Sequence, residues 1–216
     1  MYDKTIFIVG YGRTGSTLLK NIISTIPNCH ISGENGNALY HLFSSVRTIE
    51  NWQKTLKPTK LFLEDAAWAN LDKINVTEYK KELWTIFVNK ILLPKVDTKI
   101  VGFKEIRAFH DTANFNNYMN FLLSIDLNSK ILFSTRNNED VMKSGWWKTR
   151  PNKEKILIQY NEIINNYNSK NPENTYICHH NTYVNNFEET KKIFDFLSEK
   201  MDYDKIDKVI KKKKYS

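Results

Sequence analysis

The sequence has little of what marks several classes of protein. Its two cysteines, Cys29 and Cys178, stand far apart in 216 residues and exclude a disulfide scaffold and a four-cysteine zinc module. Seven glycines and five prolines form no linker-like tract, and there is no internal repeat. No apolar run approaches the roughly 18 residues of a membrane span. These absences favour a single domain built around its own core.

The amino-terminal segment offers no room for a secretory signal. The apolar stretch 6–9 is short and only five residues precede it, so the basic, apolar and cleavage regions of a signal peptide do not fit. As written, the sequence predicts a cytoplasmic protein without a membrane span.

One sign of charge dominates the composition. Lys and Arg number 32 against 24 Asp and Glu, giving a net charge of +8. Hydrophobic residues make up 41% and charged residues 26%, which is typical of a soluble globular domain. The excess suggests an anionic partner, but nucleic acid, a membrane surface and a phosphorylated small molecule all satisfy it.

Apolar strands alternate with amphipathic helices along the chain. This alternation predicts an α/β fold with three layers, in which helices cover both faces of a central parallel β-sheet. We expect one domain over 1–216, with 35–95 as a mostly helical, substrate-facing insertion that has Leu83, Ile86, Phe87 and Ile91 on one face. The expected strands are 4–9, 29–32, 100–103, 131–134 and 175–178, and the expected helices outside the insertion are 18–26, 115–123, 187–200 and 203–213.

A glycine-rich turn, residues 10–17, follows the first expected strand and precedes a helix. Gly10, Gly15 and Thr17 match the phosphate-loop pattern G-x-x-x-x-G-K-[ST], but Ser16 replaces its lysine and Arg13 supplies a cation within the loop. Backbone N–H groups and the helix N-terminus favour an anion there. Without the lysine or an acidic partner for Mg²⁺, the turn suits a phosphate-like anion better than ATP·Mg²⁺.

This turn resembles the 5′-phosphosulfate loop of sulfotransferases that use 3′-phosphoadenylyl sulfate. In that family a basic residue stands where Arg13 is, followed by a small residue, a glycine and two hydroxyl residues, here Ser16 and Thr17. The resemblance implies a P-loop-like sulfotransferase architecture. It also implies that Arg13, Thr14, Gly15, Ser16 and Thr17 bind the donor.

A second segment, 131–144, is similar to the other donor motif of the family. The family places an arginine at a strand end and a serine eight residues later, and both contact the ribose 3′-phosphate; Arg136 and Ser144 have this spacing. We expect Ser144 about one turn into a helix that starts after Asp140. Segments 101–107 and 144–148 also resemble blocks in a subset of the family.

Transfer of a sulfuryl group to a hydroxyl needs a base and positive charge near the leaving phosphate. We expect Arg13 and Lys104 to supply the charge without a metal. Glu34, directly after the second strand, is the first candidate for the base because several carbohydrate sulfotransferases carry their catalytic glutamate there. Ile106 occupies the position where other members have a histidine base. The competing candidates for the base are Glu105, His30, His41 and His110.

Three further features have a structural and a functional interpretation. One of Trp146 and Trp147 lines the adenine or acceptor pocket, and at least one packs in the core. Arg107 and Lys148 add positive potential. His179 and His180 have no ligand partners at suitable spacing and indicate a strand end, so no metal site is expected. The lysine run 211–214 is interpreted as a solvated tail.

The sequence therefore predicts a metal-free sulfotransferase that acts on a hydroxyl acceptor, with a carbohydrate or glycoconjugate favoured and no nucleic-acid partner. A small-molecule, P-loop kinase-like phosphotransferase is the alternative. A non-catalytic basic protein that binds RNA or anionic glycans is a third class, but only 146–148 offers the aromatic and basic interleaving it needs.

Overall fold

The computed structural model describes residues 2–56 and 66–214. The chain divides into two compact units. One runs to Gly36 and resumes at Pro94, and it contains the β-sheet; the other, Asn37–Leu93, is helical. The helical unit lies within the 35–95 segment singled out as an insertion, and its role toward substrate stays a prediction.

The sheet has five strands in the order β2-β3-β1-β4-β5, and every neighbouring pair is parallel. This confirms the predicted α/β class. The parallel arrangement brings all five carboxyl ends to one edge, where ligands of open α/β sheets bind. The strands are β1 (Lys4–Gly10), β2 (Cys29–Ser32), β3 (Ile100–Glu105), β4 (Ser129–Thr135) and β5 (Thr175–His179).

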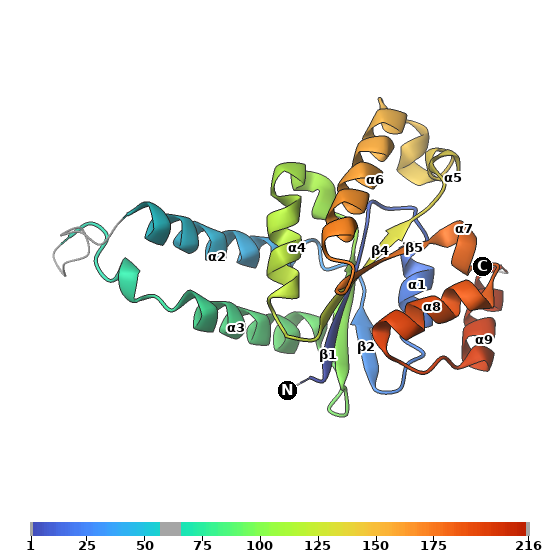
Figure 1. Cartoon of the computed structure of the whole chain (residues 1–216), viewed down its shortest axis with the longest axis horizontal. Coiled ribbons are helices and arrows are strands. Elements are labelled where there is room, and N and C mark those ends of the chain that lie inside the picture. The colour runs from blue at the N-terminus through green and yellow to red at the C-terminus, as the bar shows by residue number, and fades with distance from the viewer. Residues whose placement is uncertain (1, 57–65, 215–216) are drawn as a thin grey trace. The chain divides into compact units, whose positions relative to one another are not determined.

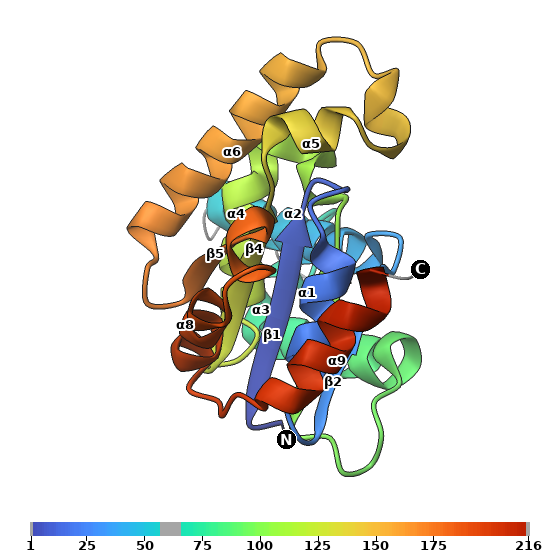
Figure 2. The same ribbon diagram turned by 90° about the vertical axis from the view of Figure 1, so that its right-hand side faces the viewer.

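Aliphatic side chains fill one face of the sheet. Ile6 and Ile8 of β1 and Leu132 of β4 join a buried cluster with residues of three helices. Those helices lie on the same side of the sheet in Figures 1 and 2. They are α1 (Ser16–Ile23), α8 (Phe187–Leu197) and α9 (Tyr203–Lys214).

Aromatic rings fill the opposite face, because side chains alternate along each strand. Phe7 meets Phe103 at 5.2 Å between ring centroids, and Phe133 of β4 meets Phe115 and Tyr167 at 6.1 Å and 6.0 Å. Phe115 begins α4 (Phe115–Leu123) and Tyr167 belongs to α6 (Lys153–Lys170). The two helices therefore form the third layer (Figure 1).

The five strands and four helices predicted outside the insertion are all present, and their ends differ from the prediction by at most three residues. Helix α1 stops at Ile23, and a turn leads to Pro27, where the prediction ran to residue 26. The sequence did not predict α6. No described helix is both long and apolar enough to cross a bilayer. Short elements at the carboxyl edge are η4 (Ala108–Asn114), α5 (Asn138–Met142), η5 (Gly145–Lys148) and α7 (His180–Tyr183).

The helical unit corrects one predicted face. Ile86 and Ile91 are about half exposed, whereas Trp84, Phe87 and Leu92 are buried. For Ile91 the cause is a π-helical turn, η3 (Val88–Leu92), whose i→i+5 repeat puts Leu92 rather than Ile91 below Phe87. Ile86 precedes this turn and lies about 100° around α3 from Phe87, outside the buried stripe. The other elements of this unit are α2 (Ala38–Thr55), η2 (Leu71–Lys73) and α3 (Val76–Phe87).

Candidate functional site

The turn between β1 and α1 has the backbone of an anion-binding loop. Gly12 and Gly15 have φ angles of 80° and 84°, and Arg13 between them has a φ of 61°. A left-handed conformation at a residue with a side chain costs about 1–3 kcal/mol and is found most often at functional sites. The turn then leads into α1, so the positive end of that helix points toward the loop.

The two glycines are required by what lies against them. A Cβ on Gly12 would lie 2.5 Å from Cζ2 of Trp146, and one on Gly15 would lie 2.1 Å from Cδ2 of His180. Any larger residue would displace a ring or shift the loop. The loop is therefore held between an indole from η5 and an imidazole from α7.

The two donor motifs meet at Arg13. Its guanidinium is exposed, and its Nε donates a hydrogen bond of 2.8 Å to Oγ of Ser144. Over residues 2–56 and 66–214, Arg13 forms no ion pair. The charge of this arginine is thus balanced by a hydroxyl dipole and not by a carboxylate.

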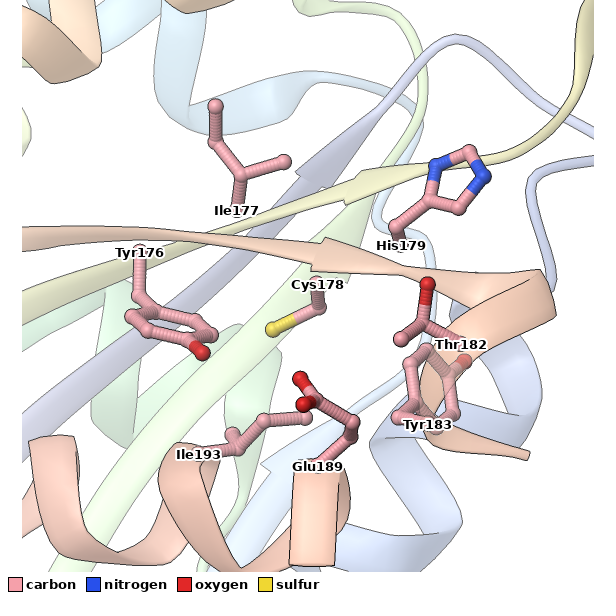
Figure 3. A pocket seen from close by; sticks show the side chains of 8 residues that line it. All are labelled: Tyr176, Ile177, Cys178, His179, Thr182, Tyr183, Glu189 and Ile193. Carbon is pink, nitrogen blue, oxygen red and sulfur yellow. The ribbon is translucent and has the colours of Figure 1, made fainter. Parts of the chain in front are cut away.

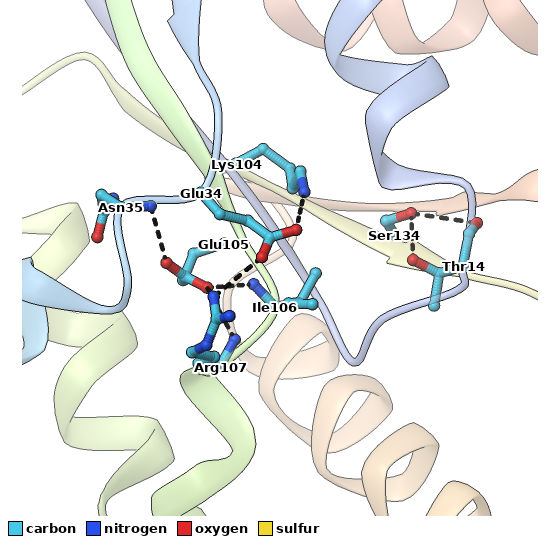
Figure 4. A network of polar contacts seen from close by, with 8 residues as sticks. All are labelled: Thr14, Glu34, Asn35, Lys104, Glu105, Ile106, Arg107 and Ser134. Atoms are coloured by element: carbon cyan, nitrogen blue, oxygen red, sulfur yellow. Dashed lines mark hydrogen bonds and ion pairs between the residues drawn. The ribbon is translucent and has the colours of Figure 1, made fainter. Parts of the chain in front are cut away.

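The hydroxyl residues of the loop have different surroundings. Thr14 is fully buried, and its Oγ1 is 2.9 Å from Oγ of Ser134 on β4 (Figure 4). Its side chain therefore anchors the loop to the sheet, and Thr14 is not among the residues that line the cavity. Ser16 and Thr17, at the start of α1, line a cavity instead.

Ser144 is not in a helix, which corrects the prediction. Helix α5 ends at Met142, and Ser144 has extended backbone angles just before η5. Gly145, with a φ of 54°, follows it and turns the chain so that its Cα faces the side chain of Arg13. The contact with Arg13 is made from this turn.

Arg136 follows β4 and lines the same cavity as Arg13. Its Nε is 3.4 Å from Oδ2 of Asp140, but it is buried and has no hydrogen-bond partner of good geometry among the described residues. The hydroxyl of Tyr11 lies 3.4 Å from the carbonyl oxygen of Arg136 and donates to Asn161 at 3.1 Å. Tyr11 therefore links the loop to the residue that follows β4.

Glu34 lies between two cations. Lys104 donates to its Oε1, and Nη1 of Arg107 donates to its Oε2 at 2.9 Å (Figure 4). Partial burial raises the pKa of Glu34, but the hydrogen bonds and charges of Lys104 and Arg107 outweigh burial and hold that pKa below its ordinary value. Glu34 is thus a carboxylate at neutral pH.

The carboxylate of Glu105 is buried and is hydrogen-bonded mainly to backbone N–H groups. The residue is 1% exposed and accepts hydrogen bonds from the backbone N–H groups of Ile106, Arg107 and Asn35 at 2.8, 3.1 and 3.2 Å. Nη1 of Arg107 adds a further bond of 3.2 Å. Because strand residues alternate, Glu105 points to the opposite face from Lys104. Its carboxylate joins the end of β3 to the segment after β2.

An open cavity of about 380 Å³ unites most of the predicted residues. A volume of this order suits a small-molecule ligand. Four cations, one carboxylate, two hydroxyl residues and two glycines surround it, together with two apolar side chains. Its lining residues are Gly12, Arg13, Gly15, Ser16, Thr17, Glu34, Lys104, Ile106, Arg107, Arg136 and Trp146.

Of the two adjacent tryptophans, Trp147 packs in the core and Trp146 lines the cavity. Trp147 is fully buried and carries the guanidinium of Arg150 over its ring at 4.8 Å. Trp146 is 49% exposed and borders the cavity.

The histidines lie away from the carboxylates of the cavity. His179 ends β5 and is 3.1 Å from Thr135 Oγ1 through Nδ1 and 2.9 Å from Asn137 Oδ1 through Nε2. It also borders a small cavity of about 70 Å³ with Cys178 and Tyr183 (Figure 3). In the part of the chain that the structure describes, no three His, Cys, Asp or Glu side chains are grouped to hold a metal.

The other histidine candidates are not among the lining residues. His30, within β2, borders a different cavity with Cys29 and Lys95, and His41 and His110 are exposed. The position of His180 against Gly15 was not foreseen. Its place just after a parallel strand was the available signal, because such residues gather at the carboxyl edge.

A parallel sheet, an anion-binding loop after its first strand and a cationic cavity at its carboxyl edge form a site suited to a phosphate-like anion. The chain belongs to the sulfotransferase family, whose model matches residues 5–202. A solved structure, the sulfotransferase STF1 of Mycobacterium tuberculosis, aligns with 98% of this chain and 71% of that chain at 12% identity and a TM-score of 0.49. No curated protein sequence matches the chain.

Proposed function

We propose that the chain transfers a sulfuryl group from 3′-phosphoadenylyl sulfate to a hydroxyl acceptor. The sulfotransferase family implies this donor. One observation carries the proposal: Arg13, Glu34 and Lys104, which come from three strand ends, line a single cavity. A cation for the donor and a carboxylate for the acceptor thus lie at one place.

The 5′-phosphosulfate is assigned to the loop between β1 and α1. Arg13 supplies the charge, Ser16 and Thr17 supply hydroxyl donors, and Thr14 and Gly15 contribute backbone groups. Anions bind well at such a helix N-terminus, and charge-assisted hydrogen bonds are about twice as strong as neutral ones. The buried side chain of Thr14 supports this assignment indirectly, because it fixes the loop to β4.

The ribose 3′-phosphate is assigned to Arg136 and Ser144. The guanidinium of Arg136 matches the oxygens of a phosphate and has a buried Nε that lacks a well-aligned partner among the described residues. The Ser144 oxygen accepts from Arg13 and keeps its own proton to donate. One hydroxyl can then contact the 3′-phosphate while it orients the arginine of the 5′ site.

In the proposed reaction, the acceptor oxygen attacks sulfur and its proton passes to Glu34. The bond from sulfur to the bridging oxygen breaks, and adenosine 3′,5′-bisphosphate leaves with the electron pair. Arg13 and Lys104 stabilise the charge on that oxygen. We propose that no metal ion is needed, because these two cations can reach the place where the charge develops.

The ion pair between Lys104 and Glu34 is compatible with both roles. An ammonium has three N–H donors and a carboxylate has about four acceptor sites. Lys104 can therefore hold Glu34 and contact the donor, while Glu34 still accepts a proton. Glu105 is the weaker candidate for the base, because three backbone N–H groups and Arg107 already occupy its oxygens.

For the acceptor, we propose a carbohydrate or glycoconjugate. The support is the position of Glu34 directly after β2, which is similar to that of the catalytic glutamate in carbohydrate sulfotransferases. No nucleic-acid partner is proposed, since the cations of the cavity are accounted for by the donor and by Glu34.

Turnover with alternative donors tests the proposal. We expect 3′-phosphoadenylyl sulfate to be converted to adenosine 3′,5′-bisphosphate in proportion to added acceptor, with the rate unchanged by EDTA. Transfer of phosphate from ATP·Mg²⁺, with no consumption of the sulfated donor, would establish the kinase-like alternative.

A further inference from the structure

The charged cavity has one apolar wall. Among its eleven lining residues, only Ile106 and Trp146 are large and apolar; the other nine are charged residues, hydroxyl residues or glycines. The two side chains meet over Gly12: a Cβ there would lie 2.5 Å from Trp146 Cζ2 and 3.4 Å from Ile106 Cδ1. Both apolar side chains therefore lie against the loop at Gly12 and border the same cavity.

The residues next to Trp146 are packed against the rest of the unit, whereas Trp146 itself is half exposed. Trp147 is fully buried and fixes η5 to the core, and Gly145 turns the chain beside Arg13. Trp146 nevertheless keeps 49% of its surface exposed and borders the cavity. An indole that packs on Gly12 and is half exposed offers a flat apolar surface to a ligand.

The place of Ile106 indicates which substrate the wall serves. Ile106 is two residues after Lys104, whose ammonium is bonded to Glu34. The wall thus borders the pair that handles the acceptor proton. The anion sites lie at the loop backbone, the start of α1 and Arg136, where polar and charged groups line the cavity.

We propose that Trp146 and Ile106 form the acceptor subsite, and that the acceptor hydroxyl is carried on a ring with an apolar face. The C–H face of a pyranose and the face of an aromatic ring share this chemistry. The ring lies on the indole and directs its hydroxyl toward Glu34. This assignment rests on the proposed function, because it takes Glu34 as the base.

Kinetics of Trp146→Ala and Trp146→Phe test the subsite. The acceptors are methyl β-D-glucopyranoside, p-nitrophenol and the linear 1-butanol. We expect Trp146→Ala to raise KM for the ring acceptor roughly tenfold. Because Trp146 also packs on Gly12 of the donor loop, KM for 1-butanol and the Kd of adenosine 3′,5′-bisphosphate should change too, but by clearly less. Trp146→Phe, which keeps a ring, should remain near wild type. The ring acceptor whose KM rises more in Trp146→Ala, the glucoside or p-nitrophenol, identifies the class of the natural acceptor.

Saturation-transfer NMR gives a readout that needs no turnover. With the bisphosphate-loaded protein, ring protons of the glucoside or p-nitrophenol should receive saturation that Trp146→Ala abolishes and Trp146→Phe retains. Trp52→Ala is the matched control, since Trp52 is 41% exposed and does not line this cavity. Equal KM changes for ring and linear acceptors would overturn the subsite.

The main alternative is that Trp146 and Ile106 bind the donor and not the acceptor. If Trp146→Ala weakens the bisphosphate as much as the ring acceptors, the wall binds adenine and the proposal is wrong. Failure of the proposed function looks different, because wild-type protein would then neither bind the bisphosphate nor consume the sulfated donor. In that case, saturation transfer to the ring protons is measured without the bisphosphate. Loss of this saturation in Trp146→Ala would support the ring-binding subsite, and its persistence would refute the subsite.

Discussion

The two halves of the carboxyl edge of the sheet use positive charge differently. After β2 and β3, the cations Lys104 and Arg107 are matched by the carboxylates of Glu34 and Glu105. After β1, Arg13 is bonded to a serine hydroxyl and, within the described residues, to no carboxylate. The charges after β2 and β3 therefore nearly cancel, whereas the charge of Arg13 after β1 is not cancelled by a carboxylate of the described residues.

In the proposed reaction, this difference separates donor binding from proton transfer. A cation without a counter-ion beside a helix N-terminus attracts an anion, so the β1 half suits a donor with several negative charges. A carboxylate held between two cations stays ionised and fixed in place, so Glu34 in the β2 and β3 half can accept a hydrogen bond from the acceptor hydroxyl. The +8 net charge alone did not reveal this division.

Replacing Glu34 should have the largest effect. Glu34→Gln keeps the shape of the side chain but removes the proton acceptor, so we expect kcat to fall by about 10²–10⁴-fold while the bisphosphate Kd stays near wild type. Steady-state kinetics and calorimetry measure the two quantities. Glu105→Gln is the comparison: it should lower the melting temperature, because Glu105 accepts three backbone N–H groups. Turnover that survives in Glu34→Gln would assign the base to Glu105 or a histidine.

Removal of the uncompensated cation should come next. Arg13→Ala is expected to lower kcat by about 10²–10³-fold, the usual effect of losing one group that stabilises developing charge, and to weaken bisphosphate binding. Arg13→Lys should recover part of both losses. Lys20→Ala, in α1 but not among the cavity-lining residues, is the control for general charge effects. If Lys20→Ala and Arg13→Ala behave alike, net charge rather than the loop explains the affinity.

Arg136 should show a smaller and more selective effect. A charge-assisted hydrogen bond contributes about 1.5–3 kcal/mol, so Arg136→Ala should weaken adenosine 3′,5′-bisphosphate by roughly 10–100-fold and 5′-AMP far less. Competition binding with both nucleotides measures the difference. Equal losses would show that Arg136 does not contact the 3′-phosphate.

The smallest of the expected effects concerns the pH dependence of activity. Because the pKa of Glu34 is lowered, its carboxylate is present at neutral pH and is protonated only below the ordinary range of a glutamate. Activity, and the stability that this pairing contributes, should therefore hold above that range and fall as the pH drops through the lowered pKa. Arg107→Ala should move the acid limb of the kcat profile upward. A limb that stays in place would mean that Arg107 does not act on Glu34.

Much of the fold could be predicted because the strands are continuous apolar runs between clear breaks. The division between an aliphatic face, with Ile6 and Ile8, and an aromatic face, with Phe7, was seen only in the structure. Helix α6 was missed because its buried residues, Leu157, Ile164 and Tyr167, are few and lie among asparagines and charged residues. The position of Ile91 was wrong because the π-helical turn after α3 has no clear sequence signature.

The candidate site could be predicted as a set of residues but not as a set of contacts. Loop glycines, Arg13 and the residues at strand ends follow from the parallel sheet, and the cavity contains most of them. The bond from Arg13 to Ser144 was not predictable, since it depends on the turn at Gly145 after α5. The pairing of Glu34 with Arg107 likewise joins residues 73 positions apart.

Thermal stability with two nucleotides tests the division of the edge most directly. Adenosine 3′,5′-bisphosphate in EDTA should raise the melting temperature of the wild-type protein, and ATP·Mg²⁺ should raise it much less. The bisphosphate shift should be lost in Arg13→Ala and kept in Glu34→Gln. A larger shift with ATP·Mg²⁺, or a bisphosphate shift that survives without Arg13, would contradict the assignment of the β1 half to a 3′-phosphorylated donor.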